Sequence, residues 1–242
     1  MENKIYTAPV ETTVVNEGLR QYLMKVFNYM AGGLCITALV SWLMVSNPSI
    51  LRIFYNITPQ GASLSGFGWL AFLAPLVIVF AFGWVINRGT AAQVKGVFWL
   101  YSALMGVSLC PILLLYTGES ITRVFLITAA TFGAMSLYGY TTKRDLSGMG
   151  SFLFMGLIGI IIASLVNAFF LKSSGMSYAI SFISVLVFTG LTAYDIQNIK
   201  AMYADYEDSE TASKKAVAGA LSLYLDFINI FIHLLQLIGD RK

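Results

Sequence analysis

The sequence predicts an all-α polytopic membrane protein with seven transmembrane helices. Hydrophobic residues make up 57% of the 242 residues and charged residues only 11%, whereas about 25% of the residues of a soluble domain are usually charged. The apolar residues also gather in runs of the length that a helix needs to cross the hydrocarbon core of a bilayer, which is about 20 residues. The lipid bilayer is therefore the first expected partner of the chain.

Each predicted span is an apolar run bounded by polar or turn-forming residues. The seven runs fall near residues 25–45, 67–87, 94–117, 121–142, 151–171, 177–199 and 217–238. The first 24 residues are polar and lack the short apolar core and cleavage site of a signal peptide. We expect an N-terminal arm over residues 1–24 and one transmembrane domain over residues 25–242. The long segment after the first span, which contains Pro48 and Pro59, is expected to be a surface loop with one short interfacial turn.

The distribution of Lys and Arg predicts that the N-terminus is cytoplasmic, because cytoplasmic loops carry the excess of these residues. With this orientation, ten of the fifteen Lys and Arg residues fall on the inner side. The formal net charge of +3 is too small to indicate a nucleic-acid partner. Cys35 and Cys110 both lie inside apolar runs, where a thiol behaves as a small hydrophobic group, so neither a disulfide framework nor a cysteine metal site is expected.

Two aspartates interrupt the last two apolar runs. Asp195 lies in "LTAYDIQNIK", five residues before Lys200, or about 7 Å deep at the rise of an α-helix. Asp226 lies about nine residues inside the last span, or about 13 Å deep, and Arg88 ends the second span on the same side. An ionisable group within a span costs roughly 2.5–3.5 kcal/mol on insertion scales and therefore indicates a function.

The last span carries a polar stripe on one face, with spacings of 4, 3, 4 and 3 residues. Its members are Ser222, Asp226, Asn229, His233 and Gln236. Because a polar stripe does not face lipid, we predict that this helix stands in the middle of the bundle. In the sixth span, Asn198 shares a face with Asp195 and Thr192. If the two faces meet, two carboxylates and two amides converge.

Two carboxylates at close range in a low dielectric cannot both ionise freely, so the two together form a candidate pH sensor. Arg88 either holds one ionised carboxylate as a latch or extends to the interface as an anchor. Ca²⁺ usually takes six to eight oxygen ligands. The two carboxylates, Asn198, Ser222 and Asn229 would give only a weak calcium site, as a conduction path requires. His233 is interpreted as a satisfied interior group more readily than as a proton relay, and no cofactor is expected.

Three segments resemble the Bax inhibitor (transmembrane Bax inhibitor motif) family in its bacterial inner-membrane branch. They are "SLYGYTTKRDLSGMG", "TGLTAYDIQNIK" and "LSLYLDFINIFIHLLQLIG". The resemblance runs from about residue 20 to the end. It implies an inner-membrane, seven-helix fold with the last helix central, and a pH-sensitive passive calcium leak governed by two aspartates and a second-helix arginine, which match Asp195, Asp226 and Arg88. The family pattern often reads YDTQ, so Ile196 replaces a threonine hydroxyl here.

Two alternatives were weighed against the leak channel. Members of the same family also act by binding other membrane proteins, including a membrane-bound protease, so the chain could be a membrane-embedded regulator without transport of its own. The aspartates also resemble those of intramembrane aspartyl proteases. However, the second acid lies in "LYLDF" without the Gly-x-Gly-Asp motif of those enzymes, and the chain has no Pro-Ala-Leu segment. We therefore do not expect an enzyme.

Overall fold

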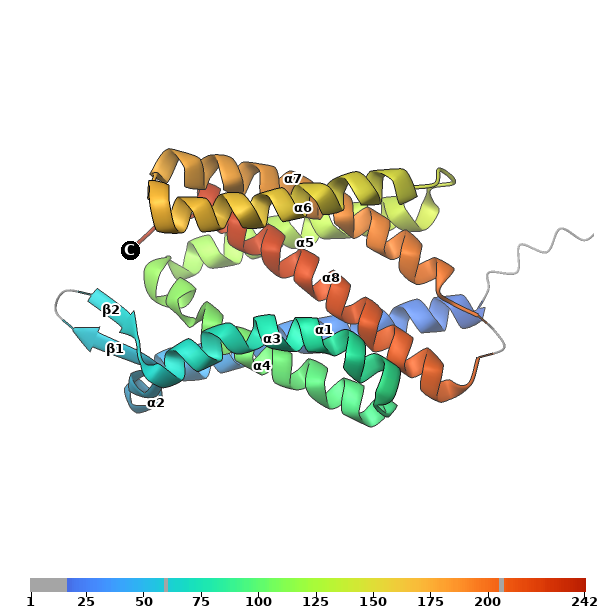
Figure 1. The fold of residues 1–242 in the computed structure, drawn as a ribbon, viewed down its shortest axis with the longest axis horizontal. Helices are drawn as coiled ribbons and strands as arrows, with labels where there is room; N and C mark the ends of the chain where they lie inside the picture. The colour runs from blue at the N-terminus through green and yellow to red at the C-terminus, as the bar shows by residue number, and fades with distance from the viewer. Residues whose placement is uncertain (1–16, 59–60, 205–206) are drawn as a thin grey trace, which may run out of the picture.

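The computed structural model describes residues 17–58, 61–204 and 207–242 of the chain. Within these residues, seven helices are long and apolar enough to cross a membrane, which confirms the predicted fold class. They are α1 (Glu17–Ser46), α3 (Gly66–Arg88), α4 (Ala91–Leu115), α5 (Gly118–Thr141), α6 (Ser147–Val166, continued by a π-helical turn over Asn167–Leu171), α7 (Ser174–Ala201) and α8 (Ser209–Ile238). Figure 1 shows them as one elongated bundle.

Several helices extend beyond the predicted spans because their ends are set by polar caps and not by hydropathy. The side chains of Thr90, Ser173 and Asp208 accept hydrogen bonds from backbone N–H groups in the first turns of α4, α7 and α8. As a result α8 begins at Ser209 instead of near residue 217. Helix α1 begins at Glu17, so part of the predicted N-terminal arm is helical; residues 1–16 of that arm lie outside the described residues.

The segment between α1 and α3 is more ordered in the structure than the predicted surface loop. A short helix, α2 (Pro48–Phe54), leads into an antiparallel hairpin of β1 (Tyr55–Thr58) and β2 (Gly61–Leu64). The Tyr55 hydroxyl donates a hydrogen bond to the carbonyl of Val107 in α4 at 2.9 Å. This contact joins the hairpin to the bundle, and strands of four residues are too short to give a clear alternating pattern in the sequence.

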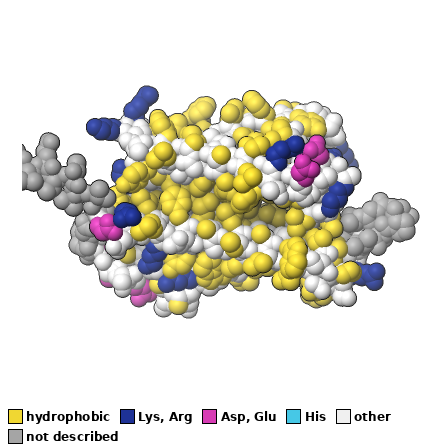
Figure 2. Space-filling view, turned by 180° about the vertical axis from the view of Figure 1, so that it is seen from behind, with side chains coloured by type: hydrophobic (Ala, Val, Ile, Leu, Met, Phe, Trp, Pro, Cys, Tyr) yellow, Lys and Arg dark blue, Asp and Glu magenta, His cyan; other side chains and the backbone are white. Residues whose placement is uncertain are grey.

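The hairpin and the C-terminus lie at one end of the bundle, and the connection from α7 to α8 lies at the other (Figure 1). We call these the outer end and the inner end, after the predicted orientation. Charged side chains gather toward the two ends, and hydrophobic side chains cover much of the middle (Figure 2). This distribution is expected for a protein whose middle faces lipid.

Helices α1 and α4 run parallel and lie close together through small residues. The Thr37 hydroxyl is 2.8 Å from the carbonyl oxygen of Ser102, and the Ser41 hydroxyl donates to the carbonyl of Gly106 at 2.6 Å. Small and hydroxyl-bearing residues allow close approach of helix backbones in membranes. Helix α8 packs on this pair and also on α5 and α7. Helix α8 thus contacts four of the six other spans. Its predicted position in the middle of the bundle, enclosed by all of them, stays a prediction.

Candidate functional site

The candidate site is centred on Asp226, in the middle of α8. Its side chain is buried, with 3% of the residue surface exposed. Among the described residues, its Oδ2 atom has no hydrogen-bond partner. The next residue, Phe227, makes edge-to-face ring contacts with Phe125 and Phe132 of α5, with ring centroids 5.5 and 5.6 Å apart. This packing orients α8 beside α5 at the level of the carboxyl group.

Asp195 of α7 lies close enough to Asp226 for the charges of the two carboxyl groups to interact. We call these two residues the aspartate pair. Helices α7 and α8 run antiparallel, because Ser181 contacts Gln236 and Thr192 contacts Asp226. Asp195, three residues after Thr192, therefore lies about one turn nearer the inner end than Asp226. The structure thus brings together the two carboxyl groups that the sequence singled out.

Thr192 links the aspartate pair to the backbone of α7. Its hydroxyl donates to the carbonyl of Phe188 at 2.8 Å and lies near the carboxyl group of Asp226. A hydroxyl has one proton to donate. While that proton is given to Phe188, it is not available to the carboxyl group of Asp226. An ionised Asp226 would instead take the proton away from Phe188.

Arg88 is not brought to the aspartate pair. It is exposed, and its guanidinium carbon lies 5.7 Å from the centroid of the Trp84 ring. Within the described part of the chain, no ion pair joins Arg88 to a carboxylate. Gly89, its neighbour, accepts a hydrogen bond from Lys214 at 3.1 Å, and Lys214 precedes Asp226 by twelve residues, or about 18 Å along α8. The predicted latch is therefore not formed in this structure, and Arg88 takes the position of an interfacial anchor.

The other predicted polar groups separate instead of converging. Asn229 donates to the carbonyl of Leu225 in its own helix at 2.8 Å, and Ser222 is half-buried. Asn198 lines a cavity at the inner end. The aspartate pair and Thr192 alone offer fewer oxygens than the six to eight that Ca²⁺ usually takes. In the described residues, no group of three or more His, Cys, Asp and Glu side chains could hold a metal ion.

His233 belongs to a second polar cluster, about 10 Å farther along α8 toward the outer end. Its Nδ1 atom lies 3.3 Å from the hydroxyl of Ser181, which donates to Gln236 at 2.6 Å. The imidazole also stacks on the Phe188 ring, with centroids 6.5 Å apart. Sequence reasoning missed Ser181, although it precedes Asp195 by fourteen residues, or about four turns, and so lies near the same face of α7.

A cavity of about 410 Å³ adjoins this second cluster between α4, α7 and α8. Ser181 and Gln236 contribute polar groups to its wall, whereas Ile112, Leu115 and Leu235 contribute apolar ones. The cavity lies near the outer end, where α7 begins and α8 ends. The polar stripe of α8 thus reaches from the aspartate pair to an opening at that end.

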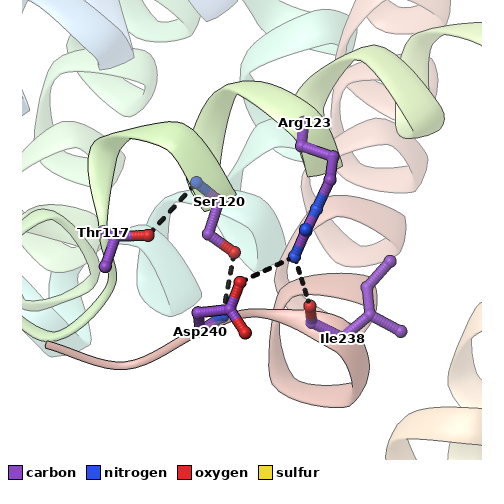
Figure 3. A network of polar contacts seen from close by, with 5 residues as sticks. All are labelled: Thr117, Ser120, Arg123, Ile238 and Asp240. Carbon is purple, nitrogen blue, oxygen red and sulfur yellow. Dashed lines mark hydrogen bonds and ion pairs between the residues drawn. The ribbon is translucent and has the colours of Figure 1, made fainter.

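The end of α8 is fixed to α5 by a polar network, shown in Figure 3. Arg123 donates to the carboxylate of Asp240 at 2.9 Å and to the carbonyl of Ile238 at 3.1 Å. The backbone N–H of Asp240 donates to the hydroxyl of Ser120 in the first turn of α5 at 2.9 Å. Thr117 caps the N-terminus of α5 by accepting a hydrogen bond from the backbone N–H of Ser120. These contacts hold the helix that carries Asp226 at its outer end.

Comparison with known proteins gives a consistent family. The family model described as "Inhibitor of apoptosis-promoting Bax1" matches residues 19–242. The chain is 45% identical over 241 residues to an uncharacterized protein of Rickettsia prowazekii (strain Madrid E), and the match covers 98% of both chains. It is 44% identical over 227 residues to the inner membrane protein YbhL of Escherichia coli (strain K12), with 93% of this chain and 94% of that protein covered. An uncharacterized membrane protein of Streptococcus pyogenes serotype M6 is 40% identical over 224 residues, covering 92% and 93% of the two chains.

Proposed function

Because the chain belongs to the Bax inhibitor family, we propose that it is a pH-sensitive passive leak pathway for cations, with calcium as the main permeant ion. The aspartate pair would be its proton sensor. The resemblance of the two aspartate segments to that family supports this proposal, and the inner-membrane relative is compatible with a function in a bilayer.

The observation that carries the proposal is the buried carboxyl group of Asp226, which has an unpartnered oxygen beside a second carboxyl group. An unpartnered polar atom inside a protein is costly, and an ionised one more so. Ionisation of Asp226 would add repulsion from Asp195 and would compete with Phe188 for the Thr192 proton. Protonation of Asp226 removes the repulsion and the competition. The packing of α7 against α8 would therefore depend on how many protons the aspartate pair carries.

A cation near the aspartate pair would have few ligands from the protein. Such weak binding suits conduction better than tight binding. Two carboxylates and one hydroxyl offer fewer oxygens than the six to eight that Ca²⁺ usually takes, so water completes the shell. A conduction path needs an ion that can leave as well as enter. The cavity of about 410 Å³ beside Ser181 and Gln236 would give a hydrated cation access from the outer end, and the polar stripe of α8 would lead it toward Asp226.

The test is calcium flux into proteoliposomes that hold a fluorescent indicator, scanned from about pH 5 to pH 8. We expect protein-dependent flux that varies with pH, and we expect Asp195→Asn and Asp226→Asn each to remove that variation while the protein still folds. Glu119→Gln is the control, because it removes an exposed carboxylate from the first turn of α5 and should leave the pH profile unchanged.

Two results would contradict the proposal in different ways. Flux with an unaltered pH profile in both aspartate variants would remove the sensor role. Absence of flux above empty liposomes at every pH would remove the channel itself and favour a regulator that binds other membrane proteins. Purification with a crosslinked membrane neighbour would then be the next measurement.

A further inference from the structure

A second cavity, of about 330 Å³, lies between the turn that joins α5 to α6 and the last turns of α7. Both segments are at the inner end of the bundle (Figure 1). Its lining includes the polar side chains of Lys143, Arg144, Asp145, Tyr194, Gln197 and Asn198. The cavity is separate from the aspartate pair, although α7 contributes to both. Neither the leak pathway nor its gating gives a role to these basic residues.

The turn that forms one wall of the cavity is held in place by Gln197. The side-chain oxygen of Gln197 accepts a hydrogen bond from the backbone N–H of Leu146, and its side-chain nitrogen donates to the carbonyl of Arg144, both at 2.8 Å. Leu146 is itself buried. A wall that is already ordered loses little conformational entropy when a ligand binds.

The charge at the cavity is positive. Lys143 and Arg144 are exposed, and within the described ranges neither of them forms an ion pair. Asp145 is the one acid of the lining, and its carboxylate accepts a hydrogen bond from the backbone N–H of Ser147 at 2.9 Å. Hydrogen bonds from Ser147 lower the pKa of Asp145, so this carboxylate is charged at neutral pH, and two cations against one anion leave the three side chains with a net charge of +1.

Tyr194 keeps its position in the cavity wall because α6 has a glycine opposite its ring. A Cβ atom at Gly150 would lie 2.5 Å from the Tyr194 ring. The ring therefore packs directly on the α6 backbone, and it contributes to the cavity at the level where helices leave the membrane. Tyr is favoured at that level because its aromatic ring is apolar and its hydroxyl group is polar.

The α6 helix continues from the cavity as an apolar surface. Phe152 and Met155 follow the turn at helical spacing and have 70% and 67% of their surfaces exposed. Only a small share of α6 is buried inside the protein. A ligand with a phosphate at the cavity and acyl chains along α6 would satisfy both surfaces, whereas a free phosphate would use only the first.

We propose that this cavity binds the phosphate headgroup of an anionic phospholipid, with Lys143 and Arg144 as the charged contacts. Arg and Lys bind phosphate through charge-assisted hydrogen bonds. Basic pockets between transmembrane helices near the cytoplasmic side suit anionic headgroups, which supply the complementary charge. The acyl chains of the lipid lie along the exposed face of α6.

The experiment measures the melting temperature of the full chain in neutral detergent while short-chain dioctanoyl phosphatidylglycerol is added. We expect a saturable rise, and a loss of apparent affinity of roughly tenfold or more in the double variant Lys143→Gln with Arg144→Gln. Dioctanoyl phosphatidylcholine, which has no net charge, should give a much smaller rise. The charge-preserving exchange Lys143→Arg with Arg144→Lys should retain binding and shows that the turn still folds.

The matched control is Arg20→Gln with Lys25→Gln, which removes two positive charges from the inner end without touching the cavity. It should bind phosphatidylglycerol as the wild type does. Equal loss in both double variants would mean general surface attraction and would overturn the site. An equal rise with phosphatidylcholine would overturn the role of charge, and an equal rise with inorganic phosphate would overturn the lipid as the occupant. None of these readouts depends on ion flux.

Discussion

The hydroxyl groups of Thr37 and Tyr224 lie 2.6 Å apart, and this contact joins α1 to α8 two residues before the buried Asp226. The Thr37 oxygen also lies 3.0 Å and 2.8 Å from the carbonyl oxygens of Gly33 and Ser102. Since Thr37 has one hydroxyl proton and carbonyls only accept, that proton goes to a carbonyl and Tyr224 donates to Thr37. The contact therefore has a direction.

That direction predicts unequal effects of the two isosteric substitutions. Tyr224→Phe removes a donor and leaves Thr37 still bonded to a carbonyl, so we expect a loss of about 0.6 kcal/mol, the average for such contacts in membrane bundles. Thr37→Val leaves the buried Tyr224 hydroxyl without its acceptor and should cost about 1–3 kcal/mol. The free energy of unfolding, measured for both single variants and the double variant, checks this. Additive losses would show that the two hydroxyl groups do not interact.

The close approach of α5 to α7 gives a second prediction. A Cβ atom at Gly139 would lie 2.3 Å from the carbonyl oxygen of Ala193, which precedes Asp195 by two residues. Gly139→Ala should therefore push the helices apart and cost about 1–3 kcal/mol. It should also alter the pH profile of flux, because α7 carries one member of the aspartate pair.

Gly133, in the same helix, is the control for this substitution. Apart from the neighbouring residues and backbone of its own helix, no described atom lies within 4 Å of the position that its Cβ would occupy. Gly133→Ala should be neutral or stabilise the protein by up to about 0.5–1 kcal/mol, since alanine is the better helix former. Thermal unfolding of the two variants in the same detergent compares them directly, and equal destabilisation would contradict the assigned close contact.

The sequence was informative where one physical rule acts alone. Runs of apolar residues predicted the seven spans because the bilayer fixes their length, and the helical period placed Asp195 and Asp226 on faces that the structure brings together. Ile196 illustrates what such a pattern leaves out. It stands where the sequence resemblance led us to expect a threonine, and it is buried, while the hydroxyl near Asp226 belongs to Thr192, one turn earlier.

The remaining features depend on contacts between segments that are distant in the chain. The order of the hairpin depends on Tyr55 reaching the backbone of Val107 in another helix. The prediction that Arg88 lies near the depth of the aspartate pair depends on helices α3, α7 and α8 ending at the same level of the membrane. In the structure, Lys214 of an extended α8 binds the turn beside Arg88, and this places the arginine about three turns of α8 from Asp226. Hydropathy carries no information about either arrangement.

Arg88 accordingly has a prediction of its own. Because the guanidinium lies over Trp84 and not at the aspartate pair, Arg88→Gln should leave the pH profile of calcium flux unchanged. Arg20→Gln, at the same end of the bundle, serves as the comparison for a lost surface charge. A raised basal leak in Arg88→Gln alone would restore the latch and would mean that another conformation brings Arg88 to a carboxylate.

The start of α8 should respond to pH through its cap. Asp208 accepts a hydrogen bond from the backbone N–H of Thr211 at 3.1 Å, and hydrogen bonds from Thr211 lower the pKa of the Asp208 carboxyl. A lowered pKa in the folded state means that the cap stabilises α8 at neutral pH and that this contribution is lost as the pH falls through the folded pKa. Hydrogen-exchange protection at Thr211 should therefore decrease in acid.

Asp208→Asn separates the charge of this cap from its geometry, because asparagine is also a good cap but does not titrate. We expect its protection at Thr211 to be similar to wild type at neutral pH and to stay nearly constant in acid. Asp208→Ala should show low protection at every pH. If Asp208→Asn loses protection in acid as the wild type does, another group controls the first turn of α8, and the nearby Glu210, which accepts a hydrogen bond from Ala91 at 3.2 Å, is the next residue to substitute.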